Sequence, residues 1–269
     1  MNPRVSVVMS VYNAEHYLVD SIKSILNQSY SDLEFLIVDD CSSDNSYNII
    51  KRFADKDPRI RHFKNNINKG LTKNLNFLIS ISKGTYIARM DADDISLGQR
   101  FEKQIDFLEK NISIDILGTS IQEINEKGEL LFIRKYPNEP KIIRQYICKA
   151  SPIAHPAVMM RKNVFNNLSY NEKLRTSQDI DLWFNALKNG YQISNLNEIL
   201  LFYRRSETFY QRRAFRKGVQ ELFIYLNGIL MLHGITWRII FPVLRFLFRL
   251  LPAKASTFIY SSSIRKSFN

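Results

Sequence analysis

Three aspartates follow a short apolar stretch near the middle of the chain. Residues 86–94 read YIARMDADD, in which five residues suited to a buried strand precede Asp91, Asp93 and Asp94. Carboxylates at this spacing supply hard oxygen ligands of the kind that bind Mg²⁺ or Mn²⁺, and such an ion in turn bridges phosphates. The alternative is a solvated acidic turn, so the place of these aspartates in the fold decides between the two readings.

Strand and helix patterns alternate along the first 90 residues. Apolar, β-branched runs predict strands, and apolar residues at helical spacing predict helices. The strands are expected at 5–12, 35–38, 60–63 and 86–90, and the helices at 14–28, 43–54 and 71–82. This alternation predicts an α/β fold with a mainly parallel central sheet that is covered on both faces.

Polar residues follow the predicted strands at the points where each strand ends. They are Tyr12 with Asn13, Asp39 with Asp40, residues 68–70, and the aspartates from 91 to 94. Ligands of open α/β sheets bind beyond these strand ends, so the residues should meet in one crevice. Like charges in one crevice repel unless a cation or a hydrogen-bond donor compensates them, and a metal with a nucleobase would do so.

Two common nucleotide-binding signatures are missing from the sequence. The first predicted strand is followed by SVYNAE in place of G-x-G-x-x-G, and no G-x-x-x-x-G-K-[ST] occurs. These absences disfavour a nicotinamide-dependent enzyme and a P-loop protein.

The basic charge of the chain is concentrated near its C-terminus. The 269 residues, 45% of them hydrophobic, are enough for one large domain or one domain with an appendage, and their net charge is +12. Residues 204–269 hold 12 Lys and Arg and two acids, which is +10 of that total. We therefore expect a nearly neutral body and a basic extension that meets something anionic.

The cysteines and the N-terminus favour a cytoplasmic location. Cys41 and Cys148 are far apart and fit neither a disulfide framework nor a zinc cluster. The first residues, MNPRVSVVMS, lack the pattern of a secretory signal.

Six motifs occur in the order and approximate spacing of the inverting family 2 glycosyltransferases of bacterial surface-polysaccharide assembly. They are SVVMSVYNAEHYL, FLIVDDCSSDNS, NKGLTKNLN, GTYIARMDADDIS, HPAVMMRK and SQDIDLW, within residues 4–205. The chain resembles this family. The resemblance implies a glycosyltransferase A-type (GT-A) domain at 1–205, a nucleotide-diphosphate sugar donor, most simply a UDP-sugar, and Mn²⁺ or Mg²⁺ as cofactor.

The resemblance also assigns roles to individual donor-site residues. Ser10, Tyr12 and Asn13 match the segment that lines the nucleotide, and Asp40 matches the aspartate that accepts a hydrogen bond from the uracil, with Asp39 behind it. Lys73 and Asn76 match positions that face the nucleotide. Asp91 and Asp93 match the metal and ribose pair, with Asp93 the stronger candidate for the metal, while Asp94 orients its neighbours. A helix cap or a loop role for Asp39 and a solvated lysine for Lys73 remain open.

A second acidic site lies far downstream, at TSQDIDLW. Inversion needs a base on the face of the sugar opposite the leaving nucleoside diphosphate, and the resemblance implies that Asp179 is this base. The family usually has glutamate where this chain has Gln178, and often glycine where it has Cys41. Asp179 or Asp181 could instead cap the following helix. His155 and Trp183 are candidate contacts for the acceptor or a phosphate, with a structural histidine and a core tryptophan as the alternatives.

The C-terminal residues 206–269 are predicted to form a helical extension that associates with a membrane. Residues 237–251 read WRIIFPVLRFLFRLL, with Arg238, Arg245 and Arg249 on one helical stripe and apolar residues around the rest. The segment is too short and charged to span a bilayer but fits an anionic membrane surface. Further upstream, basic residues add cationic surface; they are Arg204, Arg205, Arg212, Arg213, Arg216 and Lys217. Packing on the catalytic domain or on a second subunit is an open alternative, and nucleic-acid binding is disfavoured because the aromatics sit in a dense aliphatic stripe.

These features predict an inverting, metal-dependent hexosyltransferase that is peripheral on the inner face of the cell membrane. Its acceptor is expected to be a saccharide carried on a lipid diphosphate. The alternative is a non-catalytic nucleotide-sugar-binding or scaffold protein of the same fold, which would tolerate loss of Asp179.

Overall fold

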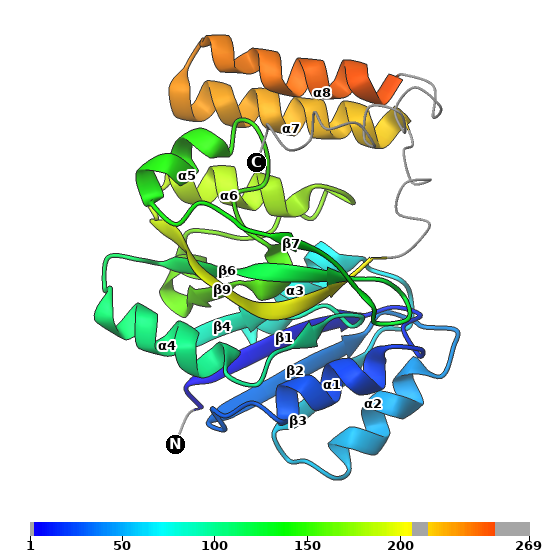
Figure 1. Cartoon of the computed structure of the whole chain (residues 1–269). Coiled ribbons are helices and arrows are strands. Elements are labelled where there is room, and N and C mark those ends of the chain that lie inside the picture. Colours follow the sequence, from blue (N-terminus) through cyan, green and yellow to red (C-terminus); the bar gives the residue numbers. More distant parts are fainter. Residues whose placement is uncertain (1–2, 206–214, 251–269) are drawn as a thin grey trace.

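The computed structural model describes residues 3–205 and 215–250. Its strands and helices alternate at first, as the sequence predicts (Figure 1). The first elements are β1 (Val5–Val11), α1 (Leu18–Leu26), β2 (Leu33–Asp39), α2 (Ser46–Ala54), β3 (Ile60–Lys64), α3 (Leu71–Ser80) and β4 (Tyr86–Arg89). The later elements are β5 (Ile95–Ser96), α4 (Arg100–Lys110), β6 (Ile116–Ile124), β7 (Leu130–Arg134), α5 (Pro140–Tyr146), β8 (Met159–Arg161), α6 (Gln178–Lys188), β9 (Ile193–Arg204), α7 (Phe215–His233) and α8 (Ile240–Leu250).

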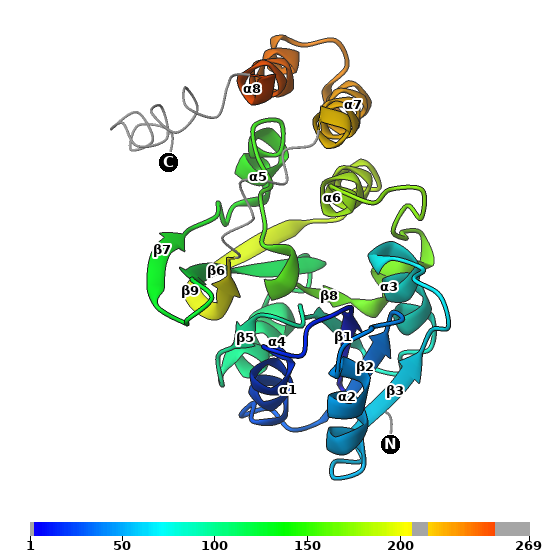
Figure 2. The same cartoon turned by 90° about the vertical axis from the view of Figure 1, so that its right-hand side faces the viewer.

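The first four strands form a parallel half-sheet in the order β3-β2-β1-β4. The residues of β1, β2 and β4 are almost all buried because helices cover both faces, whereas the edge strand β3 is mostly half-buried (Figure 2). Val5, Val7 and Met9 pack in a core with α1, α2 and α4, whereas Val8 packs in a second core with α3 and α6. The two cores follow from the alternation of side chains along a strand.

The rest of the sheet is mixed rather than parallel. β8 lies between β4 and β6 and is antiparallel to both, β6 is parallel to β9, and β5 and β7 pair antiparallel at the outside. Beyond residue 90 the strands no longer alternate regularly with helices, so the sequence pattern does not foresee this arrangement. The expectation of an α/β, GT-A type fold holds, with its parallel part confined largely to the first half of the chain.

The C-terminal helices form a hairpin that packs on the body of the protein. Phe184 of α6 stacks edge-on against Tyr225 of α7 at 5.7 Å between ring centroids. Gly228 lets the two helices approach, because a Cβ there would lie 2.3 Å from the Phe184 ring. α8 then packs along α7 (Figures 1 and 2). None of the helices within 3–205 and 215–250 is long and apolar enough to cross a bilayer.

Candidate active site

The ends of β1 and β2 bring their polar residues together at one edge of the sheet. Tyr12 is 54% exposed directly beyond β1. Asn13 joins the two loops: its amide N–H donates to Ser42 Oγ at 3.0 Å, and its side-chain oxygen accepts from the backbone N–H of Ser43 at 2.9 Å. Asn13 and Cys41 have φ of 49° and 65°. Left-handed backbone at two non-glycine residues in adjoining loops is a local strain of the kind that gathers at functional sites.

Asp40 organises the loop that follows β3. Its Oδ1 accepts from Asn65 Nδ2 and from the amide of Lys69, and its Oδ2 accepts from the amide of Gly70, each at 2.8 Å. Burial alone would raise the pKa of Asp40, but these hydrogen bonds outweigh burial and lower the pKa. Asp40 is therefore an ionised, buried anchor at the floor of the expected nucleotide site.

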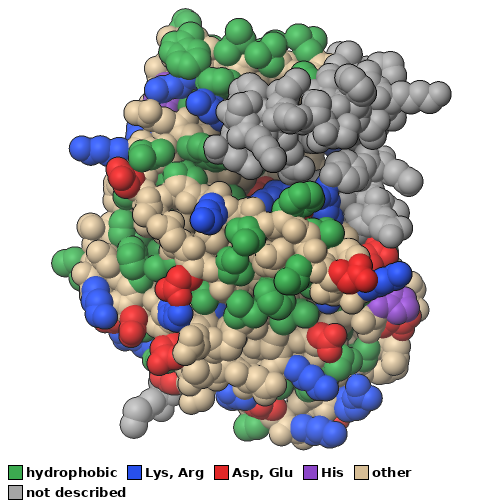
Figure 3. Space-filling view, in the orientation of Figure 1, with side chains coloured by type: hydrophobic (Ala, Val, Ile, Leu, Met, Phe, Trp, Pro, Cys, Tyr) green, Lys and Arg blue, Asp and Glu red, His purple; other side chains and the backbone are tan. Residues whose placement is uncertain are grey.

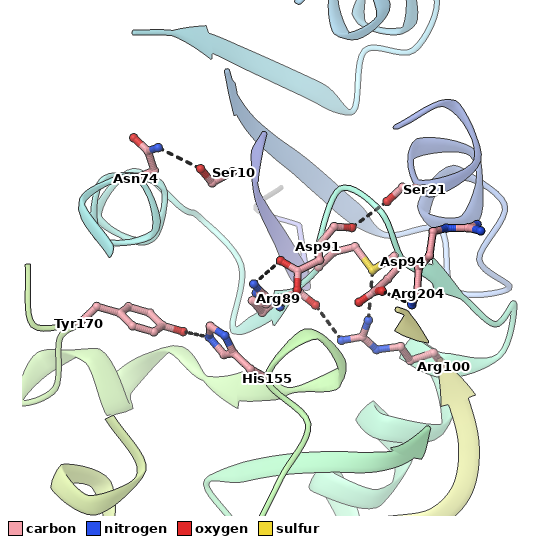
Figure 4. A network of polar contacts seen from close by, with 11 residues as sticks. Ser10, Ser21, Asn74, Arg89, Asp91, Asp94, Arg100, His155, Tyr170 and Arg204 are labelled. Carbon is pink, nitrogen blue, oxygen red and sulfur yellow. Dashed lines mark hydrogen bonds and ion pairs between the residues drawn. The ribbon is translucent and has the colours of Figure 1, made fainter. Parts of the chain in front are cut away.

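A chain of amides links this anchor to β1. Asn65 donates to Asn74 Oδ1, and Asn74 donates to Ser10 Oγ at 2.9 Å (Figure 4). Asn74, which the sequence motifs do not point to, thus joins the loop after β3 to the end of β1. Asn76 bonds to the backbone of Tyr170 and to Glu172 instead, and it fastens α3 to residues 170–172.

Asp39 and Lys73 differ in exposure. Lys73 is exposed on α3. Asp39 is fully buried; one oxygen accepts from the amide of Ser42 at 3.2 Å, and the other has no hydrogen-bond partner among the described residues. The contact with Ser42 lies within the loop after β2, three residues on, and does not cap α2.

The acidic turn after β4 gathers three carboxylates. Oxygens of Asp91, Asp93 and Asp94 lie within 4.8 Å of one another. Arg89, buried in β4, donates to both oxygens of Asp91 (Figure 4). Asp94 is 1% exposed, so this turn is not simply a solvated one.

The other two carboxylates of the turn are incompletely compensated. Desolvation and then repulsion from Asp91 raise the pKa of Asp93 to about 6, although Asp93 remains exposed on one side. Burial, followed by the charges of Asp91 and Asp93, raises the pKa of Asp94. One Asp94 oxygen accepts from the amide of Arg204 at 2.8 Å, and the other, although buried, has no partner within the described chain. Hard oxygen donors that repel each other in this way fit a divalent cation.

Two further arginines hold this turn from behind. Arg100 is fully buried and donates to the carbonyls of Arg89 at 2.9 Å and Val158 at 3.2 Å (Figure 4). Burial and then the charge of Arg89 lower the pKa of Arg100 to about 9, so it stays protonated at neutral pH. Arg204 donates to the carbonyl of Asp93 at 2.9 Å and lies over the ring of Tyr17. Arg100 thus holds the strand end before the acidic turn, and Arg204 holds the turn itself.

Asp179 lies in the first turn of α6, after a strained residue. Ser177, which begins the helix, has φ of 55° and makes no side-chain cap. Burial raises the pKa of Asp179, backbone hydrogen bonds and Arg89 oppose the rise, and Glu221 of α7 adds to it. The carboxyl of Asp181 is bonded instead to Asn185 of the same helix.

The comparisons with known proteins bear on this arrangement. The family model described as "Glycosyl transferase family 2" matches residues 6–169. The chain belongs to the family 2 glycosyltransferases. It is 36% identical over 215 residues to the O-antigen biosynthesis glycosyltransferase WbnJ of Escherichia coli, an alignment that covers 78% of this chain and 83% of WbnJ.

Solved structures agree on the fold of this family 2 glycosyltransferase. One is S. aureus TarS 1–349 in complex with UDP-GlcNAc, with a TM-score of 0.69, 18% identity, and coverage of 98% of this chain and 77% of TarS. Another is the mannosyltransferase PcManGT of Pyrobaculum calidifontis in complex with GDP-Man and Mn²⁺, with a TM-score of 0.66, 14% identity, and coverage of 100% and 82%. Both show the GT-A type architecture.

Two side chains that were candidate contacts for the acceptor or a phosphate are buried and do not line the surface. Trp183 is fully buried in the core beside α6, so it offers no stacking face to a sugar here. His155 is buried and pairs with Tyr170 through Nε2 and the hydroxyl at 2.7 Å (Figure 4). Burial and the nearby Arg89 lower the pKa of His155, which keeps it neutral. Both residues therefore take the structural role that the sequence left open.

Several residues that act on the carboxylates of the site were not predicted from the sequence. Arg89 carries the clearest signal, since it is the one charged residue in the strand YIARM. A buried strand tolerates an arginine only when it is paired, and the nearest acid is Asp91. Glu221 gives no such signal, because its nearness to Asp179 depends on how α7 packs on α6.

Proposed function

We propose that this glycosyltransferase moves a hexosyl group from a UDP-sugar to a saccharide acceptor with inversion at the anomeric carbon. The acceptor would be carried on a lipid diphosphate at the inner face of the cell membrane, in the synthesis of a surface polysaccharide. WbnJ, a relative named for O-antigen biosynthesis, supports the polysaccharide, and the UDP-GlcNAc complex of TarS supports the donor class.

The donor would bind across the ends of β1, β2 and β4. Tyr12 is exposed there and can stack on the base, while Ser10 and Asn13 line the floor. Asp40 would receive the imide N–H of uracil with its remaining acceptor capacity, and Asp39 would support the loop behind it. Lys73 is exposed and would meet the diphosphate.

Mn²⁺ or Mg²⁺ would be held by Asp93, with Asp91 beside it. When bound, the ion offsets the negative charge that develops on the departing diphosphate. Asp93 suits this role because its pKa of about 6 leaves it ionised at neutral pH, and because no cationic side chain of the described residues is bonded directly to its carboxylate. The Mn²⁺ in the PcManGT complex supports the choice of ion.

Asp179 would act as the base of the displacement. An acceptor hydroxyl oxygen forms a bond to C1 of the sugar, the bond from C1 to the UDP oxygen breaks, and the hydroxyl proton moves to Asp179. A raised pKa favours this transfer, because the carboxylate holds the proton more tightly than a solvated aspartate would.

The observation that carries this proposal is that the charge of Arg89 acts on both acidic sites. Arg89 pairs with Asp91, and its charge also opposes the rise in the pKa of Asp93 and of Asp179. An inverting displacement needs a carboxylate group on the donor side and a separate base, and the two acidic sites would supply them.

The test is release of UDP from a panel of UDP-sugars, with Mn²⁺ or Mg²⁺ and membrane lipid extract as the acceptor source. Asp179→Asn should lower turnover by about 10²- to 10⁴-fold, the usual contribution of a general base. Asp181→Asn is the matched control, because this carboxylate lies on the same helix but bonds to Asn185. Equal turnover by Asp179→Asn and wild type would show that Asp179 is not the base. Donor binding without turnover would favour a non-catalytic sugar-nucleotide-binding protein.

A further inference from the structure

The outer side of the C-terminal hairpin carries a stripe of exposed apolar residues. They recur on α8 and the turn before it at helical spacing, and their side chains are 42% to 69% exposed. We call this stripe the outer apolar face: Trp237, Ile240, Leu244, Leu247 and Phe248. Hydrophobic side chains line the molecule over α8 in the space-filling view (Figure 3).

The inner side of α8 is occupied by the protein itself. Arg245 pairs with Glu221 of α7 at 3.3 Å and lies 4.6 Å over the ring of Tyr225. Pro242 is buried nearby. The sequence places Arg245 on one helical stripe with Arg238 and Arg249; in the structure its guanidinium turns inward, where it contacts Glu221 and Tyr225 of α7. The side chain of Arg249 lies outside the described residues.

Positive charge beside the C-terminal hairpin comes from the segment around α5. Lys141, Arg144 and Lys149 are exposed on and just after α5. This segment adjoins the hairpin, since Lys149 lies 5.2 Å over the ring of Phe241 and His233 contacts the carbonyl of Arg144 at 3.1 Å. Arg238 lies at the start of the stripe and contacts His233. An apolar strip beside cationic groups is complementary to an anionic lipid surface.

We propose that the outer apolar face docks α8 in the plane of an anionic bilayer, with Lys141 and Lys149 against the head groups. This surface deepens the proposed function and rests on it, because a lipid-linked acceptor would then lie beside the enzyme. Eleven residues of helix extend only about 16 Å, which suits a helix lying in the interface. Trp237 is the kind of residue that settles at the level of the head groups.

A second copy of the chain is the less favoured occupant. Its own lysines and arginines would meet those of the first copy around the same strip, and like charges oppose such a contact. An anionic bilayer instead satisfies both the apolar strip and the cations.

The test is flotation of the full chain with vesicles of phosphatidylcholine, with and without phosphatidylglycerol. Wild type should float with the anionic vesicles. Leu244→Ser with Leu247→Ser should lower its partition coefficient at least about tenfold, because both side chains would otherwise be buried in the interface. Lys141→Gln with Lys149→Gln should lower partition to anionic vesicles by about tenfold and leave partition to neutral vesicles unchanged.

The matched control is Ile112→Ser with Leu130→Ser, which removes two apolar residues that are 83% and 67% exposed away from α8. The control should float as wild type does. Equal flotation by the α8 variant and wild type would overturn the proposal. The proposal would also be overturned if wild type did not float but formed a dimer, and if the α8 variant were a monomer. UDP release with the acceptor dispersed in detergent separates membrane docking from the proposed function. Loss of docking alone leaves this activity intact. Flotation without any UDP release would count against the proposed function only.

Discussion

Arg89 donates to both carboxylate oxygens of Asp91 from a buried position two residues earlier in the chain. A bidentate pair of this kind fixes the plane of the carboxylate as well as its charge. It also distinguishes two carboxylates of the acidic turn, because Asp91 is bonded directly to a cation, whereas the carboxylate of Asp93 is bonded to none among the described residues. We expect Asp93 to contribute more to metal affinity than Asp91.

Removing one member of this pair should cost more than removing both. Arg89→Gln leaves Asp91 beside two other carboxylates without its partner, and because the side chain of Asp91 is 30% exposed, the cost should be about 1–3 kcal/mol, below that of a fully buried pair. The double variant Arg89→Gln with Asp91→Asn should recover part of that cost, because no charge is left without its partner. Urea unfolding of the four proteins gives the coupling energy.

Asp57 and Arg59 provide the comparison for that cycle. They also form an ion pair two residues apart, at 2.8 Å, but the side chain of Arg59 is 29% exposed, whereas that of Arg89 is 3% exposed. The coupling energy of this pair should be under about 1 kcal/mol. A coupling for Arg89 and Asp91 no larger than this would contradict the structural role given to Arg89.

Asp179 should lower the stability of the protein at neutral pH. Its pKa is raised in the folded state, so between the unfolded and folded pKa values the folded protein binds more protons, and stability falls as pH rises. Asp179→Asn should therefore be more stable than wild type at neutral pH while losing turnover, and the gain should shrink as the pH is lowered.

Thermal unfolding across pH measures this gain, with Asp106→Asn, exposed on α4, as the control that should show none. A less stable Asp179→Asn at neutral pH would mean that the carboxylate is held by contacts beyond those seen here. Activity and stability that move in opposite directions are expected of a buried base and not of a helix cap.

The pair of Glu221 and Arg245 should tune the base. The charged and titratable groups that act on Asp179 are Arg89 of β4, Tyr170, and Glu221 with Tyr225 of α7. Arg245→Gln removes a cation from Glu221, so the acid limb of kcat/KM should move to higher pH, and Glu221→Gln should move it to lower pH.

UDP release measured against pH tests this tuning, and turnover well above the limb should stay within about twofold of wild type if only the charge changes. Arg238→Gln is the matched control, since this arginine lies on the same hairpin but contacts His233. Shifts of the same sign in the Glu221 and Arg245 variants would indicate a packing effect and refute the electrostatic account.

The first half of the fold could be predicted from the sequence because its signals are local. Runs such as VSVVMSV and LEFLIVD are apolar enough to be strands, and each is followed by a helix with one apolar face. The mixed half of the sheet depends on pairings such as Met160 with Ile116, which join residues far apart in the chain. No local period reports these pairings.

The site divides in the same way. Motif position and strand ends led to Asp40, Asp91, Asp93 and Asp179, but not to how their charges are compensated. Arg100 and Arg204 come from other parts of the chain and donate to the carbonyls of Arg89 and Asp93. Asn74 of α3 likewise donates to Ser10, which is far away in the sequence. The sequence favoured a core position for Trp183 and left stacking on a sugar open, and the burial of its side chain distinguishes the two.

Cys41 should be a stability defect that glycine corrects. Its φ of 65° is left-handed, which costs an L-residue about 1–2 kcal/mol and costs glycine almost nothing. The structure thus accounts for the glycine that the family often has at this position. Cys41→Gly should raise the free energy of unfolding by about 1 kcal/mol, since the more flexible unfolded chain offsets part of the gain. Cys41→Ala keeps the Cβ and should not raise the free energy of unfolding. Cys41→Val should be less stable than wild type, because a β-branched side chain tolerates this φ worst. Urea unfolding ranks the four proteins, and a glycine variant no more stable than the alanine variant would show that the loop between β2 and α2 relaxes to another backbone conformation in solution.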